Sequence, residues 1–181
     1  MPLLNERTYT LEDIYALPEG QRAELIGGQI YDMSPPNRIH QKLVMEISVA
    51  IKNYIDSKKG SCDVYPAPFA VFILKDETNY VEPDISVICD RDKLSDRGCE
   101  GAPDWIIEIV SPSSRRMDYY KKNALYADAG VREYWIVDPS KERTMVCNFE
   151  KNDSPMIISF DQPVQSGIFD DLKIVMKDLL K

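Results

Sequence analysis

Apolar residues recur along the chain with two different periods, which predict helices in some segments and strands in others. Helical spacing, supported by local end signals, is found over residues 11–17, 39–57 and 113–130. Short apolar runs predict strands at residues 23–26, 29–33, 64–74, 81–89, 105–110, 131–137, 143–149, 156–160 and 172–175, before a terminal helix at 176–180. The charged, glycine-containing segment 90–102 is expected to be a surface loop.

The segment from residue 105 to residue 137 decides the expected fold class. Its first run, Trp105–Val110, is almost entirely apolar, which is typical of a central strand covered on both faces. The helix and strand that follow favour a right-handed crossover between parallel strands. Earlier in the chain, Gly27 and Gly28 predict a two-residue hairpin turn. No linker divides the sequence, so we expect one domain over residues 1–181.

Two carboxylates interrupt this apolar pattern. Asp84 begins one strand, and Glu108 lies in the middle of Trp105–Val110. An acid in a buried strand is costly unless it is paired or binds a cation. If the two strands are neighbours, both carboxylates can meet at one point. Two hard oxygen ligands in a partly open site suit Mg²⁺ or Mn²⁺.

A cation at this point would support phosphoryl chemistry, because it polarises a phosphoryl oxygen and lowers the pKa of a bound water. Lys121 and Lys122, on the helix after the Glu108 strand, are both candidates to position the nucleophile or to stabilise the developing charge. Residues 115–122 carry four cations and one anion, a local basicity that suits a phosphate backbone. A structural alternative remains open, in which Asp84 caps a turn, Glu108 pairs with a buried lysine and the helix exposes a solvated face.

Composition limits the classes of function. Of the 181 residues, 44% are hydrophobic and 29% are charged, as in soluble globular proteins. No apolar run approaches the roughly 20 residues that span a bilayer, and residues 1–11 include Glu6 where a secretory signal would be apolar. We therefore expect a cytoplasmic protein with no membrane partner. The net charge of −8 argues against broad, passive nucleic-acid affinity.

The cysteines and the one histidine give weaker signals. The four cysteines, Cys62, Cys89, Cys99 and Cys147, have no CxxC spacing, so we expect reduced thiols and no structural zinc site. His40 lies at the start of a predicted helix, where a surface or packing role is the simpler interpretation. In the same way, Glu24 fits the exposed face of a strand.

Longer motifs resemble a known family. They are, in chain order, Glu24–Gly28, Met33–Pro36 with His40, Pro83–Val87, Ile107–Ser113, the Asp118-x-x-x-Lys122 pair and Ala129–Asp138. This pattern, over residues 10–180, resembles the Uma2 family, a domain of unknown function that is similar to the PD-(D/E)XK nuclease superfamily. The resemblance implies a restriction-endonuclease-like α/β core. It also implies metal-binding roles for Asp84 and Glu108, an acid supplied by Glu24, and an accessory role for His40.

One position departs from the superfamily pattern, which has a lysine two residues after the second acid. This chain has Val110 there. We expect the ammonium to come from the following helix, because lysine has a long flexible stem that can reach the same space. Of the two lysines there, Lys122 fits the family pattern better than Lys121.

The residues and the resemblance together predict an α/β protein with a restriction-endonuclease-like core, a mixed, bent sheet and flanking helices. The expected activity is hydrolysis of DNA phosphodiester bonds with Mg²⁺ or Mn²⁺. Asp84, Glu108, Lys122, Glu24 and His40 would be the catalytic residues, and the first two would bind the metal. A homodimer would suit duplex DNA. The alternatives are a non-catalytic module that binds nucleic acid or protein, and a purely structural assembly protein.

Overall fold

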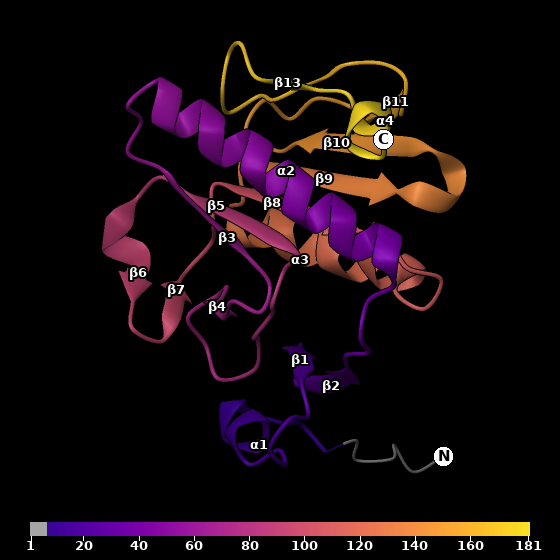
Figure 1. The fold of residues 1–181 in the computed structure, drawn as a ribbon. Helices are drawn as coiled ribbons and strands as arrows, with labels where there is room; N and C mark the ends of the chain where they lie inside the picture. The colour runs from indigo at the N-terminus through magenta and orange to yellow at the C-terminus, as the bar shows by residue number, and fades with distance from the viewer. Residues whose placement is uncertain (1–6) are drawn as a thin grey trace.

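The computed structural model describes residues 7–181, and its elements are arranged around one mixed sheet (Figure 1). The main elements are α1 (Leu11–Tyr15), β1 (Ala23–Ile26), β2 (Gln29–Asp32), α2 (Arg38–Ser57), β3 (Asp63–Pro66), β4 (Val71–Phe72), β5 (Ile85–Ile88), β6 (Leu94–Ser95), β7 (Gly98–Glu100), β8 (Trp105–Ile109), α3 (Lys122–Ala129), β9 (Glu133–Asp138), β10 (Arg143–Asn148), β11 (Met156–Ser159), β12 (Val164–Gln165), β13 (Lys173–Ile174) and α4 (Met176–Leu179). Residues 1–6, part of the segment compared above with a secretory signal, lie outside the described residues.

Six strands form the main sheet, in the order β11-β10-β9-β8-β5-β3. β8 and β9 are parallel and are connected through α3, as the strand–helix–strand order predicts. The other neighbours are antiparallel, so the sheet is mixed. β8 lies inside the sheet and all its residues are buried, in agreement with its nearly continuous apolar run.

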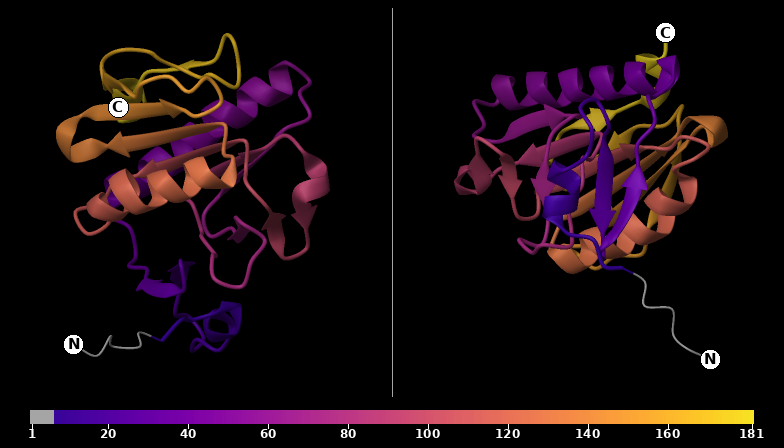
Figure 2. Two further views of the ribbon diagram at one scale, coloured as in Figure 1. Left: turned by 180° about the vertical axis from the view of Figure 1, so that it is seen from behind. Right: turned by 90° about the horizontal axis from the view of Figure 1, so that it is seen from below.

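Helices cover both faces of this sheet, as Figure 2 shows from behind and from below. α2 crosses one face, where Leu43 and Ile47 pack in the same core as Trp105. α3 covers the other face, where Leu125 packs in a second core with Ile106. Successive residues of β8 therefore enter opposite cores, as the period of a strand requires. The expected α/β fold with a sheet between helices is confirmed.

The β1–β2 hairpin brings the N-terminal part against the centre of the chain. Gly27 and Gly28 have φ values of +57° and +74°, the left-handed conformation that this two-residue turn needs. Leu25 exchanges both backbone hydrogen bonds with Tyr80, at 2.8 and 2.7 Å. This contact sets Glu24, the neighbour of Leu25 on β1, close to the segment that leads into β5.

The strand expected at residues 64–74 is wrong as a single element. It divides into β3, in the main sheet, and β4, which pairs with β7 in a separate three-stranded sheet. Pro66 and Pro68 explain the break, because a proline has no N–H to continue a ladder of hydrogen bonds.

Two shorter segments also differ from expectation. Residues 90–102 form more than a surface loop, because they contain a 3₁₀ turn at Arg91–Lys93 and the β6–β7 hairpin. β12 was not predicted, and it pairs with β13 near the C-terminus. Within residues 7–181, none of the helices has both the length and the apolar character required to cross a bilayer.

The expectation of four reduced cysteines is wrong for two of them, because Cys62 and Cys89 form a disulfide. Cys62 precedes β3 and Cys89 follows β5, and the antiparallel register pairs Asp63 with Ile88. The two cysteines therefore stand opposite each other, although 27 positions separate them. Disulfides are rare in the cytosol, so the thiol argument for a cytoplasmic location no longer holds.

Reduction of this disulfide is expected to destabilise the fold. A closed loop of this length restricts the unfolded chain by about 3–4 kcal/mol in the chain-entropy account. We expect a reducing agent to lower the melting temperature of the wild type. The Cys62→Ser/Cys89→Ser double variant should melt at this lower temperature whether or not reductant is present. An equal effect of reductant on both proteins would contradict the pairing.

Candidate active site

A pocket of about 650 Å³ opens between the β1–β2 hairpin, the start of α2 and the segment that joins β8 to α3. Glu24, His40, Asp84, Glu108 and Lys122 all line it. The structure thus brings together all five residues that the sequence suggested for a site, although they are spread over almost a hundred positions of the chain. Their catalytic roles stay predictions.

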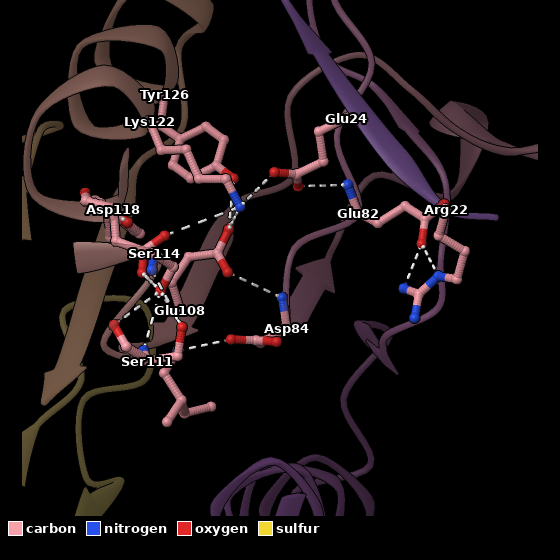
Figure 3. Close-up of polar contacts among 12 residues, drawn as sticks. Arg22, Glu24, Glu82, Asp84, Glu108, Ser111, Ser114, Asp118, Lys122 and Tyr126 are labelled. Carbon is pink, nitrogen blue, oxygen red and sulfur yellow. Dashed lines mark hydrogen bonds and ion pairs between the residues drawn. The ribbon is translucent and has the colours of Figure 1, made fainter. Parts of the chain in front are cut away.

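Asp84 and Glu108 hold each other in place across two adjacent strands. β5 and β8 pair with Ile85 opposite Ile107, so Asp84 lies opposite Glu108. Asp84 Oδ2 accepts a hydrogen bond from the backbone N–H of Ile109 at 2.8 Å, and the backbone N–H of Asp84 donates to Glu108 Oε2 at 3.3 Å. Each carboxylate is therefore held by a backbone N–H of the other strand (Figure 3).

Lys122 lies in the middle of the carboxylates, as Figure 3 shows. Its Nζ is 2.8 Å from Glu108 Oε1 and 2.9 Å from Glu24 Oε2, with Asp118 Oδ1 farther away at 4.0 Å. All four side chains are only 3–6% exposed. Burial alone would lower the pKa of Lys122, but Glu108, Glu24 and Asp118 raise it well above its ordinary value. The ammonium therefore stays charged.

The neighbouring lysine lies elsewhere. Lys121 is exposed, and its Nζ bonds the hydroxyl of Tyr31 and lies 4.6 Å from the centre of that ring. Of the two lysines left open by the sequence, Lys122 is the one in the carboxylate cluster.

Glu24 reaches the cluster through Lys122. Its Oε1 accepts a hydrogen bond from the backbone N–H of Glu82 at 3.0 Å, and its Oε2 pairs with Lys122. Glu24 is buried, so the interpretation as a polar residue on an exposed strand face is wrong.

His40 contacts Asp84 from the first turn of α2. Asn37 caps this helix by accepting a hydrogen bond from the His40 backbone N–H at 2.9 Å. His40 Nε2 is 3.1 Å from Asp84 Oδ2, while Nδ1 has no hydrogen-bond partner in residues 7–181. Burial alone would lower the pKa of His40, but the contact with Asp84 outweighs it and raises this pKa.

Acids outnumber cations in this pocket, and their pKa values reflect it. Burial raises the pKa of Glu108 well above its ordinary value, Lys122 opposes this shift, and Asp84 adds to it. Burial also raises the pKa of Asp118 to about 6, against the opposing effects of Lys122 and the Ser114 hydroxyl. Four of these acids, namely the two central carboxylates, Glu24 and Asp118, lie around Lys122 and His40, whereas Glu82 pairs with Arg22 and Asp32 lines the outer part of the pocket.

Sequence reasoning missed one contact and undervalued another. Tyr126 is fully buried, and its hydroxyl donates to Glu108 Oε1 at 2.7 Å. Asp118, named from the sequence only as part of the Asp118-x-x-x-Lys122 motif, is buried and accepts a hydrogen bond from Ser114 Oγ at 2.6 Å. The spacing could have indicated both contacts, because Asp118, Lys122 and Tyr126 are four residues apart and therefore lie on one face of a helix. A π-helical turn at Met117–Lys121 precedes α3, and such wider turns are frequent at functional sites.

The donor set fits a divalent cation bound by two carboxylates. Among residues 7–181 no group of three or more His, Cys, Asp or Glu side chains is arranged around a metal position. Mg²⁺, however, is usually held by only one or two carboxylates, with water and substrate phosphate completing its coordination. Asp84 Oδ1 accepts none of the hydrogen bonds described, and Glu108 Oε2 accepts only the long one from Asp84. These two oxygens are the available ligands.

The fold and the site define the class first: this is an α/β protein with a restriction-endonuclease-like core and an acid-rich pocket that contains a lysine. A crystal structure from Anabaena variabilis, described as "a putative nuclease belonging to DUF820", has the same fold. The TM-score is 0.76 at 23% identity, and the match covers 94% of this chain and 96% of that chain.

The chain belongs to the Uma2 family. Residues 11–167 match the profile of this family, whose description is "Putative restriction endonuclease". A Synechocystis protein named "Uncharacterized protein slr1290" is 30% identical over 135 residues, which are 74% of this chain and 68% of that relative. The resemblance proposed from the motifs is confirmed.

Replacing Lys122 is expected to destabilise the protein, because Lys122→Met leaves buried carboxylates without their cation. Breaking a buried pair in this way costs about 3–5 kcal/mol. Lys52→Met, at an exposed position of α2, is the matched control and should change the free energy of unfolding by less than about 0.5 kcal/mol.

The loss in Lys122→Met should grow with pH. Without the ammonium, the pKa of folded Glu108 rises further above its unfolded value, so the folded state binds more protons between these two values. The free energy of unfolding then falls as the pH increases. Urea denaturation at pH 5 and pH 8 measures this, and a variant as stable as the wild type at pH 8 would contradict the account.

Proposed function

We propose that this protein is an endonuclease that hydrolyses DNA phosphodiester bonds with a bound Mg²⁺ or Mn²⁺. The observation that carries the proposal is the pairing of Asp84 and Glu108 across β5 and β8, with one oxygen of each directed away from its strongest partners. Membership of the Uma2 family supports the nuclease class. The fold alone would not, because one fold hosts many activities.

The two central carboxylates would hold the cation through Asp84 Oδ1 and Glu108 Oε2. When bound, the ion supplies Lewis-acid activation of the phosphate and of a water. The remaining steps are assigned to the protein. Asp84 and Glu108 keep their positions because backbone groups hold them, so the site needs little rearrangement when the phosphate arrives.

Lys122 would donate hydrogen bonds and would not accept a proton, since its raised pKa keeps it charged. Two of its three N–H groups face Glu24 and Glu108, and Asp118 lies beyond hydrogen-bond distance at 4.0 Å. The third N–H is then available to orient the attacking water or to stabilise charge on a phosphoryl oxygen. Glu24 serves by holding this ammonium in place.

A non-catalytic module is the second candidate, and one observation favours it. The Lys122–Glu108 pair is one part of the structural alternative that the sequence left open, and it neutralises both side chains without a bound metal ion. Asp84, by contrast, bonds the facing strand and does not cap a turn. The helix has a solvated face that includes Tyr120 and Lys121, but Asp118, Lys122 and Tyr126 make its pocket side a buried one.

Cleavage assays test the proposal directly. The substrates are plasmid, linear duplex, single-stranded and branched DNA, each with Mg²⁺ or Mn²⁺. Asp84→Asn and Glu108→Gln keep the side-chain shape but weaken metal binding, so we expect at least a ~10²-fold loss of rate on whichever substrate is cut. Asp56→Asn, on the exposed surface of α2, is the matched control and should cut at the wild-type rate.

Chelation should abolish cleavage and added Mg²⁺ should restore it. DNA binding without cleavage of any of these substrates would favour the non-catalytic module. Cleavage that survives in both Asp84→Asn and Glu108→Gln would refute the proposed site.

A homodimer is the assembly we propose for cutting both strands of a duplex, because a two-fold axis relates two identical sites to two antiparallel strands. Sedimentation velocity of the free protein and of its complex with duplex DNA measures this. We expect a mass of two chains on the DNA, and one chain per duplex that still cuts both strands would contradict the dimer.

A further inference from the structure

Each proposed metal ligand has a side-chain partner besides Lys122 that fixes one of its oxygens. The Tyr126 hydroxyl donates to Glu108 Oε1, and His40 Nε2 faces Asp84 Oδ2. We infer that Tyr126 and His40 are positioning residues, which determine the carboxylate oxygens that face the cation. This inference rests on the proposed metal site and concerns how that site is held.

Tyr126 is placed rigidly enough for this role. Its ring is fully buried on α3 and packs edge-to-face on Tyr134, with ring centroids 4.9 Å apart at 85°. Its hydroxyl and the Lys122 ammonium both bond Oε1 of Glu108, at 2.7 and 2.8 Å. Because the two strongest donors occupy Oε1, the carboxylate is turned so that Oε2 faces Asp84.

His40 does the same for the other acid. Asp84 Oδ2 receives the backbone N–H of Ile109 at 2.8 Å and lies 3.1 Å from His40 Nε2. A ring nitrogen at this distance from a carboxylate must carry the proton, so Nε2 is the donor. The Asn37 cap holds the His40 backbone, which sets the ring on the Asp84 side of α2. Oδ1 is left for the cation.

Removing either donor lets its carboxylate rotate, because the terminal torsion of Asp and Glu has only broad minima. Asp84 Oδ1 or Glu108 Oε2 would then face the cation for a smaller fraction of the time. Loss of such an outer partner usually weakens metal binding 10–100-fold. Tyr126→Phe keeps the ring and removes only the hydroxyl. His40→Leu removes the donor, and His40→Gln keeps an N–H.

Tyr134→Phe is a matched control for Tyr126→Phe. Tyr134 is equally buried and its hydroxyl also makes one hydrogen bond, at 2.9 Å, but to the backbone oxygen of Asp118. This variant loses a buried hydroxyl of the same kind without touching a carboxylate of the proposed metal site.

The test measures Mn²⁺ binding by the electron paramagnetic resonance signal of free Mn²⁺, with no DNA present. We expect the dissociation constant to rise about tenfold in Tyr126→Phe and 10–100-fold in His40→Leu. Tyr134→Phe should bind as the wild type does, and His40→Gln should recover most of the loss. Thermal melts confirm that each variant is folded, and the more conservative Tyr126→Phe decides the question if His40→Leu does not fold.

Asp84→Asn and Glu108→Gln separate the two levels of the argument. If these variants lose Mn²⁺ binding while Tyr126→Phe and His40→Leu keep wild-type affinity, the positioning roles are wrong and the metal site stands. An equal loss in Tyr134→Phe would also overturn the inference, since general loosening would explain it. If all variants bind Mn²⁺ as the wild type does, the metal site itself is wrong.

Discussion

The ion pairs of Lys122 are the interaction on which the site depends. This ammonium joins Glu24 of β1 to Glu108 of β8, and it does so from α3, so it ties the N-terminal hairpin, the central strand and the crossover helix together. Four carboxylates could not be brought into one pocket without a positive charge among them. The same charge that permits folding lies next to the place where a phosphate would react.

Several features of this arrangement could be predicted from the sequence. Asp84 and Glu108 stood out because an acid within an apolar strand needs a partner, and the β8–α3–β9 order followed from a change of hydrophobic period. The departure at Val110 also has a physical explanation. Val110 is buried in the core beneath α3, together with Tyr126. The lysine that does pair with Glu108, Lys122, comes from that helix, above the same face of the sheet.

Other features depend on distant pairings that periodicity does not encode. The disulfide follows from the register of β3 on β5, which sets Cys62 opposite Cys89. The break before β4 follows from Pro66 and Pro68. Their missing N–H groups matter only where a neighbouring strand would pair with them, and the sequence does not show which strand that is. Tyr126 was not identified from the sequence, because its hydroxyl gains a role only when Glu108 lies opposite. Local patterns identified the acids of the pocket, whereas the groups that hold them required the tertiary structure.

The central claim is that Asp84 and Glu108 together bind one divalent cation. A crystal of the protein grown with Mn²⁺, measured at the manganese absorption edge, tests it most directly. The account predicts an anomalous peak in the pocket, coordinated by Asp84 Oδ1 and Glu108 Oε2, with Lys122 still paired to Glu24. A structure at saturating Mn²⁺ with no peak there, or with the metal bound only elsewhere, would contradict it.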